Sequence, residues 1–153
     1  MTKNIRHFTL EDQDQVLQIS ELLPEWFDID ARTRAIPIDI RFQEVLLVEE
    51  NGQILGFIAL YIAEGRVNIG WLGVHPDHHR QGIGGLLIKA AENYCRSVGI
   101  EELATYTLGD SVDYPPYNVT RAFYHKYGFR LYQRSQTDNP GCPEEIRLKK
   151  WVE

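Results

Sequence analysis

The residues best suited to bind a charged ligand lie in one short segment, His79–Gly85, which reads His-Arg-Gln-Gly-Ile-Gly-Gly. An apolar run, Val67–Val74, precedes the segment, and a helical pattern, Leu86–Val98, follows it. Backbone N–H groups at the start of a helix have no intrahelical partner and carry part of the helix dipole. Glycines leave this backbone bare, so that a ligand can approach closely. The segment therefore predicts a phosphate or pyrophosphate site, to which Arg80 adds a positive charge.

Two well-known phosphate-binding loops do not fit this segment. A Walker P-loop requires G-x-x-x-x-G-K-[ST], and the chain has no such string. A dinucleotide-binding loop requires G-x-G-x-x-G directly after a strand. Gly82 and Gly84 fit that pattern, but Leu87 occupies the third glycine position. Glu102 has the spacing of the acidic residue in that fingerprint, yet it begins the next strand pattern instead of ending it.

A third type of loop fits better. The segment resembles the coenzyme A loop of the GNAT superfamily of N-acetyltransferases, whose core is [Q/R]-x-x-G-x-[G/A]. His79 stands in the first position with Arg80 beside it, which leaves open which side chain meets the pyrophosphate. The alternative, a glycine-rich turn that only caps a helix, does not explain a second motif of the same family further along the chain. The residues that match this second motif are Asn118, Ala122, Phe123, Tyr124, Gly128 and Phe129.

The resemblance covers roughly Val45–Phe129 and implies an α/β (α+β) fold. The implied architecture is a mixed, mostly antiparallel twisted sheet of about six or seven strands flanked by about four helices. The implied reaction is direct transfer of the acetyl group of acetyl-CoA to an amine, which must be neutral to attack the thioester. The alternative is a catalytically silent acyl-CoA-binding or regulatory module on the same fold.

The resemblance also implies which residues contact the cofactor. The end of the central strand would hold pantetheine, the glycine-rich loop would hold the pyrophosphate, and the second motif would lie along the coenzyme arm. The residues concerned are Leu72, Gly73, Val74, His79, Arg80, Gln81, Gly82, Ile83, Gly84, Gly85, Asn118 and Phe123. Tyr124 would be the general acid, because a phenol is protonated at neutral pH and can donate to the departing sulfur. Gly70 and Gly73, inside the strand pattern, indicate a bulge or a close backbone approach.

The sequence does not identify the general base. Members of the resembled family often use a glutamate on the central strand, whereas this strand offers Asn68 and no acid. Other candidates are Asp110, Asp113, Glu25 and Asp28, and a chain of water molecules without a dedicated base is equally compatible. The missing glutamate keeps the silent alternative open, and turnover with a panel of amines would separate the two.

The segment Leu23–Asp30 combines two aromatic rings with three carboxylates. In the resembled family this region commonly lines the acceptor pocket, and such a pocket would suit a protonated amine. The alternative is that the rings belong to the core and the acids to a solvated rim. The predicted acceptor-binding residues are Glu25, Trp26, Phe27 and, from a later loop, Asp110.

Three histidines and two cysteines require separate interpretation. Zinc ligands usually lie on defined elements, whereas His75, His78 and His79 share the loop that must meet phosphate. We therefore expect no metal, and expect these side chains to supply pH-sensitive positive charge. Cys95 falls beside the apolar face of a helix and is expected to pack, while Cys142 lies in a turn, so the sequence favours direct transfer over an acyl-enzyme.

Length and composition narrow the class of protein. A chain of 153 residues is expected to form a single domain over residues 1–153. A net charge of −6 argues against nucleic acid and mildly favours a cationic acceptor. No apolar run approaches the roughly 20 residues of a membrane span, and the N-terminus has no apolar signal region, so a cytoplasmic location is expected. Edge strands expected near the C-terminus allow a homodimer.

Local patterns predict the elements that position these residues. Thr9-Leu-Glu-Asp is typical of a helix cap, and Asn51-Gly52 predicts a hairpin turn. The expected strands are Asn4–Leu10, Glu44–Glu50, Ile54–Ala63, Val67–Val74, Glu102–Leu108, Phe129–Ser135 and Glu145–Trp151. The expected helices run from Thr9 to about Leu23, over Leu86–Val98, and from Asn118 to Gly128, the last with Ala122, Phe123 and Tyr127 facing the core.

Overall fold

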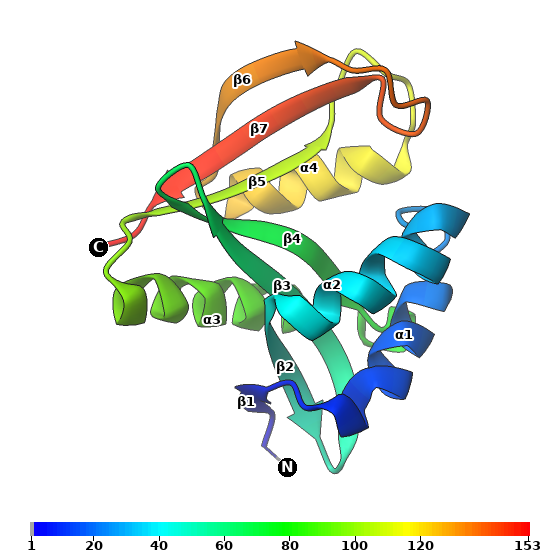
Figure 1. The fold of residues 1–153 in the computed structure, drawn as a ribbon, viewed down its shortest axis with the longest axis vertical. Helices are drawn as coiled ribbons and strands as arrows, with labels where there is room; N and C mark the ends of the chain where they lie inside the picture. Colours follow the sequence, from blue (N-terminus) through cyan, green and yellow to red (C-terminus); the bar gives the residue numbers. More distant parts are fainter. Residues whose placement is uncertain (1) are drawn as a thin grey trace.

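Seven strands form one mixed sheet in a computed structural model, which describes residues 2–153 (Figure 1). The strands are β1 (Asn4–His7), β2 (Glu44–Glu50), β3 (Gln53–Ala63), β4 (Arg66–Val74), β5 (Glu102–Leu108), β6 (Arg130–Gln136) and β7 (Glu144–Trp151). Their order across the sheet is β1-β2-β3-β4-β5-β7-β6. All neighbours are antiparallel except β4 and β5, which are parallel. The expected mixed, mostly antiparallel sheet is confirmed.

Four α-helices cover the sheet, two on each face (Figure 1). They are α1 (Gln13–Glu21), α2 (Ile36–Phe42), α3 (Ile83–Val98) and α4 (Pro116–Lys126). Three shorter helical turns are η1 (Leu10–Asp12), the π-helical η2 (Ala31–Ala35) and η3 (Pro76–His78). Helices α1 and α2 pack on one face, and α3 and α4 pack on the other. None of the helices in residues 2–153 is long and apolar enough to cross a membrane.

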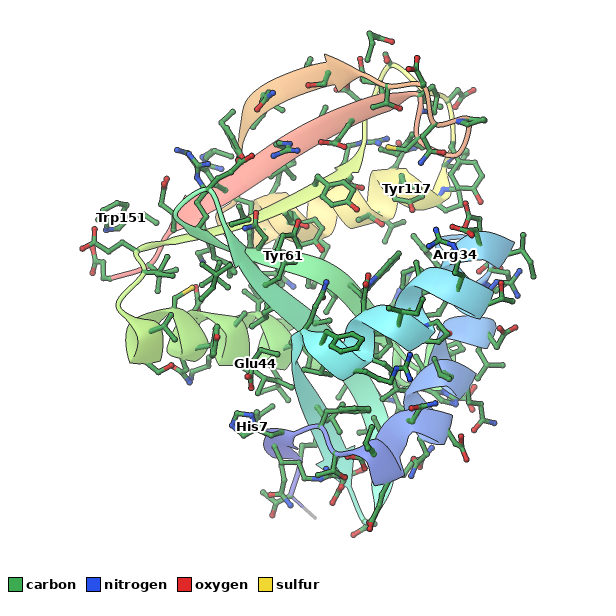
Figure 2. The ribbon with its side chains drawn as sticks, in the orientation of Figure 1. His7, Arg34, Glu44, Tyr61, Tyr117 and Trp151 are labelled. Carbon is green, nitrogen blue, oxygen red and sulfur yellow. The ribbon has the colours of Figure 1, made fainter. Side chains whose placement is uncertain are left out.

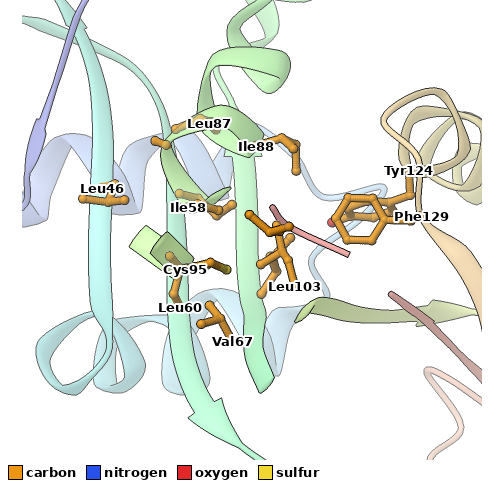
Figure 3. Packing of buried hydrophobic residues seen from close by; sticks show 14 of the residues in the cluster. Leu46, Ile58, Leu60, Val67, Leu87, Ile88, Cys95, Leu103, Tyr124 and Phe129 are labelled. Carbon is orange, nitrogen blue, oxygen red and sulfur yellow. The ribbon is translucent and has the colours of Figure 1, made fainter. Parts of the chain in front are cut away.

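The sheet separates two hydrophobic clusters because side chains alternate between its faces. Leu47 and Phe57 are fully buried in the cluster beneath α1 and α2. Their chain neighbours Leu46 and Ile58 pack on the opposite face against Leu87 of α3 (Figure 3). The second cluster continues past α3 to the aromatic residues of α4, so that one core supports both helices beside the site described below.

The predicted turns and caps are present. Asn51 and Gly52 have φ angles of 54° and 79°, which is the left-handed conformation that a tight hairpin between β2 and β3 requires. Asp12 accepts a hydrogen bond from the N–H of Thr9, which completes the predicted capping box. The hairpin and the first helix therefore follow from local sequence.

Several boundaries differ from the prediction. Strand β1 ends at His7, not Leu10, because Thr9 leaves the sheet to cap η1. Helix α1 ends at Glu21, and α3 begins at Ile83, so that Gly84 and Gly85 belong to its first turn. Helix α4 begins at Pro116, two residues before the predicted start at Asn118.

Two features were not predicted correctly. The stretch from η2 through α2 is helical and was not among the expected elements; Pro37 is accepted there because it lies in the first turn of α2. Ala122 is exposed instead of facing the core, whereas Phe123 and Tyr127 pack against the core as expected. The neighbouring Arg121 is buried instead. Its guanidinium donates to the carbonyl of Leu108 at 2.6 Å, and this hydrogen bond ties α4 to the end of β5.

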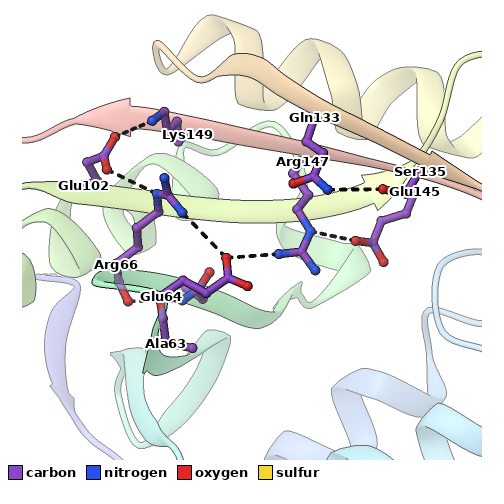
Figure 4. Close-up of polar contacts among 10 residues, drawn as sticks. Ala63, Glu64, Arg66, Glu102, Gln133, Ser135, Glu145, Arg147 and Lys149 are labelled. Carbon is purple, nitrogen blue, oxygen red and sulfur yellow. Dashed lines mark hydrogen bonds and ion pairs between the residues drawn. The ribbon is translucent and has the colours of Figure 1, made fainter.

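Ion pairs hold one end of the parallel pair together (Figure 4). Glu102, at the start of β5, accepts from Arg66 at 3.2 Å and pairs with Lys149 of β7 at 2.8 Å. Glu64, in the turn before β4, pairs with Arg147 of β7 at 3.4 Å. The starts of β4 and β5 are thus tied side by side, and the two strands separate only toward their other ends.

Candidate active site

A cleft of about 1150 Å³ lies where β4 and β5 separate. The two strands pair only from Val67, opposite Leu103, to Ile69, opposite Thr105. Beyond Ile69 the β5-facing edge of β4 has no strand partner in the described chain. Gly70 lies at a register shift between β3 and β4, which confirms the predicted bulge. A Cβ on Gly70 would lie 2.6 Å from Oε1 of Gln43, so the bulge also makes room for this side chain.

The glycine-rich loop and the N-terminus of α3 line one end of the cleft. Gly82 is the N-cap of α3 with a left-handed φ of 79°, and Arg80 is also left-handed at 62°. A Cβ built on Gly82 would meet no atom within 4 Å, so the space in front of this helix end is open. His79 reaches back across the loop, with Nε2 at 2.8 Å from the carbonyl of Val74, so this nitrogen donates. The arrangement presents helix N–H groups and a guanidinium to the cleft, which suits an anion.

The other glycines of the loop are needed for helix packing. A Cβ on Gly84 would lie 2.7 Å from Cε1 of Phe123, and one on Gly85 would collide with the hydroxyl of Tyr127. Helices α3 and α4 therefore approach closely because these positions have no side chain. This packing role comes in addition to the predicted exposure of backbone to a ligand.

Replacing Gly84 by alanine is expected to destabilise the protein. Overpacking typically costs about 1–3 kcal/mol, while alanine gains roughly 1 kcal/mol over glycine within a helix, so we expect a net loss of up to about 2 kcal/mol. Urea unfolding would measure it, and adding Phe123→Leu should restore part of the loss. A Gly84→Ala variant that is more stable than the native chain would contradict the close contact with Phe123.

Most of the residues predicted to bind the cofactor line this cleft. They are Leu72, Gly73, Val74, His79, Arg80, Gly82, Ile83, Gly84, Gly85 and Phe123. Two predicted residues do not line it. Gln81 turns back into the loop, with Nε2 at 3.4 Å from the carbonyl of Asp77 and Oε1 at 3.1 Å from Nδ1 of His78. The amide oxygen of Asn118 accepts a hydrogen bond from Arg121, which lies three residues further along α4.

Tyr124 lies at the point of strand separation. It is 5% exposed, and its ring packs between Phe123 and Phe129 with centroid distances of 5.3 and 5.1 Å. Burial raises the pKa of Tyr124 to about 12, and a hydrogen bond with Thr105 acts in the opposite direction. Thr105 is the last residue of β5 that pairs with β4. The phenol therefore stays protonated at neutral pH and lines the cleft.

The predicted acceptor segment forms one wall of the cleft, and three long-range hydrogen bonds join it to the start of α4 and the loop before it. The ring of Trp26 also lies edge-on to that of His79, with centroids 6.2 Å apart, so this wall reaches the glycine-rich loop. Trp26 donates through Nε1 to the carbonyl of Pro116 at 3.1 Å. Tyr114 donates to the carbonyl of Glu25 at 2.7 Å, and Tyr117 donates to that of Trp26 at 2.8 Å. Figure 2 shows Tyr117 at the start of α4. Phe27 is 7% exposed and packs edge-on against Trp71, so it is both core and lining.

The carboxylates considered as bases fall into two groups. Glu25, Asp28 and Asp113 line the cleft. Asp110 does not line it; its carboxylate pairs with Arg134 at 2.8 Å, which lowers its pKa. The side chain of Asn68 has a structural role, because its amide donates to the carbonyls of Ala63 and Arg66 at the turn before β4. A base on β4 is therefore not available at position 68.

The histidines of the loop and the two cysteines lie in different surroundings. His75 accepts a hydrogen bond from the N–H of Asp77, and its ring lies 5.6 Å from that of His78. No cluster of three or more metal-ligating side chains occurs within residues 2–153. Cys95 is fully buried on the core side of α3, as predicted, and burial raises the pKa of its thiol to about 11. Cys142 lines the cleft as a free thiol, and burial raises its pKa as well.

Sequence reasoning missed several residues that line the acceptor end. Trp71 donates through Nε1 to Asp39 of α2 at 2.8 Å, and Tyr106 is 45% exposed on β5. Tyr114 of the loop before α4 and Tyr117 of its first turn also line the cleft. Only their shared aromatic character was visible in the sequence, because they come from three separate places in the chain.

Comparison with known proteins agrees with this geometry. The chain matches the acetyltransferase (GNAT) domain over residues 41–131. It is 25% identical over 107 residues to the amino-acid acetyltransferase of Vibrio vulnificus, covering 69% of this chain but only 24% of that relative. The chain thus spans about a quarter of the length of the curated relatives it matches.

Solved structures share the fold at low sequence identity. A protein described as an acetyltransferase of the GNAT family from Desulfovibrio desulfuricans has a TM-score of 0.87 at 18% identity, covering 99% of this chain and all of that one. A GNAT family acetyltransferase from Elizabethkingia anophelis, solved with acetyl-CoA bound, has a TM-score of 0.74 at 21% identity, covering 98% of each chain. With both of its sequence motifs inside the matched region or at its edge, the chain belongs to the acetyltransferase (GNAT) domain family.

Proposed function

We propose that this protein transfers the acetyl group of acetyl-CoA directly to an amine. The observation that carries the proposal is the separation of β4 from β5 at Thr105, with the N-terminus of α3 at one end of the cleft and Tyr124 at the point of separation. An extended polar chain can pair with the open edge of β4, and a pyrophosphate can accept from the helix N–H groups. This combination suits a long ligand with an anionic end.

The residues present fit acetyl-CoA. Leu72, Gly73 and Val74 offer backbone N–H and C=O groups to the pantetheine arm, and Arg80 with the backbone at Gly82 would hold the pyrophosphate. Bound acetyl-CoA supplies an acetyl group activated as a thioester. The lining of the cleft then has two tasks, which are to accept a proton from the amine and to stabilise the sulfur that leaves.

Tyr124 stabilises the leaving sulfur. A phenol whose pKa is about 12 holds its proton more strongly than a thiol, which titrates near 8.5, so donation of a hydrogen bond is favoured over complete proton transfer. The buried position strengthens such a hydrogen bond, because little water competes for the phenol. Glu25, Asp28 and Asp113 are within the cleft to accept the amine proton, directly or through water.

Mixing the native chain with acetyl-CoA and a panel of amines tests the proposal. The panel includes amino acids, because the Vibrio relatives are named for that class of acceptor. We expect release of free thiol together with an acetylated product identified by mass spectrometry. Binding of acetyl-CoA without turnover of any amine would instead favour a silent acyl-CoA-binding module, and absence of both would reject the assignment of the cleft.

A further inference from the structure

The charged side chains that line the cleft form two groups of opposite sign. The cationic group lies around the start of α3, where Arg80 follows the loop histidines and Lys126 sits over the ring of Tyr127 at 5.6 Å. The acidic group lies around the segment between α1 and α2 and the loop before α4. This acidic group consists of Glu25, Asp28, Asp30 and Asp113.

Three of these four carboxylates have no cationic partner among residues 2–153. Asp30 is neutralised by Arg34, whose guanidinium binds both of its oxygens at 2.7 Å. Asp28 accepts a hydrogen bond from the N–H of Ala31 at 2.8 Å, which leaves its charge uncompensated. Within residues 2–153, neither Glu25 nor Asp113 forms a salt bridge. Glu25, Asp28 and Asp113 therefore bring unpaired negative charge to the lining of the cleft.

Aromatic side chains line the same cleft as these carboxylates. The second oxygen of Asp28 lies 3.2 Å from the position a Cβ on Gly141 would occupy, which places this carboxylate directly beside the loop between β6 and β7. Asp28 is also among the neighbours that raise the pKa of Tyr117, after burial itself. The hydrogen bonds of Trp26 and Tyr117 to backbone carbonyls fix the orientation of both rings. Fixed aromatic faces beside carboxylates favour an ammonium ion.

The reacting nitrogen of the acceptor cannot supply the positive charge that these carboxylates and rings favour, because it must be neutral when it attacks. Resting on the function proposed above, we infer that the acceptor carries a second, permanent positive charge, as in an aliphatic diamine or polyamine. The reacting amine lies at the strand separation beside Tyr124, and the second ammonium lies among the rings and carboxylates around Asp28. An acceptor carboxylate at that place would be repelled.

A matched set of acceptors tests this inference. Diaminobutane, butylamine and aminobutyrate have the same carbon chain and differ at the far end in carrying a positive charge, no charge or a negative charge. We expect kcat/KM to be about tenfold or more higher for diaminobutane than for butylamine, and lowest for aminobutyrate. The preference should shrink as salt is raised, because these carboxylates are exposed.

A pair of matched variants assigns the preference to the cleft. Asp28→Asn removes the charge and keeps an oxygen that can still accept from Ala31, whereas Asp14→Asn makes the same change on the exposed first turn of α1. The ratio of kcat/KM between diaminobutane and butylamine should fall about threefold in the first and stay as in the native chain in the second.

The outcomes separate this inference from the proposed function. If butylamine or aminobutyrate is turned over at least as efficiently as diaminobutane, the inferred second positive charge on the acceptor is wrong. The proposed acetyltransferase activity would still stand. An equal loss of preference in both variants would overturn the role of Asp28. Calorimetric titration with acetyl-CoA, run on the same samples, reports donor binding independently. Failure of all three amines with donor binding intact would reject the diamine class, whereas failure of donor binding would reject the proposed function itself.

Discussion

Tyr124→Phe is expected to lower kcat about 10²-fold while changing the affinity for acetyl-CoA by less than about threefold. The variant keeps the ring that packs between Phe123 and Phe129 and removes only the hydroxyl. That hydroxyl makes its proposed contact with a sulfur that becomes charged as the bond to carbon breaks, so its loss affects the transition state more than the ground state. Steady-state rates with saturating acetyl-CoA measure the first effect, and calorimetry measures the second.

Tyr94→Phe is a suitable control, because Tyr94 lies on α3, packs against the same hydrophobic cluster as Tyr124 and does not line the cleft, so this variant should retain native kcat. The pH profile adds a second check. With a pKa of about 12, Tyr124 stays protonated as pH rises from 7 to 10, so the native rate should rise with deprotonation of the amine and show no fall from the phenol. Native kcat in Tyr124→Phe would refute the assigned role.

Gly82→Asp is expected to weaken acetyl-CoA binding by at least about 100-fold, because it places a carboxylate where the pyrophosphate accepts from the start of α3. Gly82→Asn is the matched control. Asparagine and aspartate both tolerate the left-handed conformation, and a Cβ at this position meets no atom within 4 Å. The two variants therefore differ chiefly in charge.

Thermal unfolding with and without acetyl-CoA reports this difference, since a ligand that binds only the folded state raises Tm. We expect a ligand-dependent increase in the native chain and in Gly82→Asn, and none in Gly82→Asp. An equal increase in all three proteins would show that the pyrophosphate does not lie at this helix terminus.

Local signals in the sequence predicted much of the fold. Asn51-Gly52 specifies a turn that only a few residue types adopt, and Thr9 with Asp12 specifies a helix start within four residues. The loop at Gly82 was predicted for the same reason, because its conformation and its exposure depend on neighbours along the chain. Gly70 likewise marked the bulge that opens the cleft.

What could not be predicted depends on contacts between distant segments. Asp110 was expected at the acceptor, but its charge is taken by Arg134 of β6. Asn118 was expected along the coenzyme arm, but Arg121, buried against the end of β5, holds its side chain. The aromatic wall depends on Tyr117 reaching the backbone of Trp26, a contact that no local pattern encodes.

Titration of acetyl-CoA into the native chain by isothermal calorimetry tests the central claim most directly. The open edge of β4 and the N-terminus of α3 predict a single site with micromolar affinity, and free coenzyme A should compete for it. A titration without binding heat at several temperatures, on folded protein, would contradict the account, because the cleft would then have no donor to position beside Tyr124.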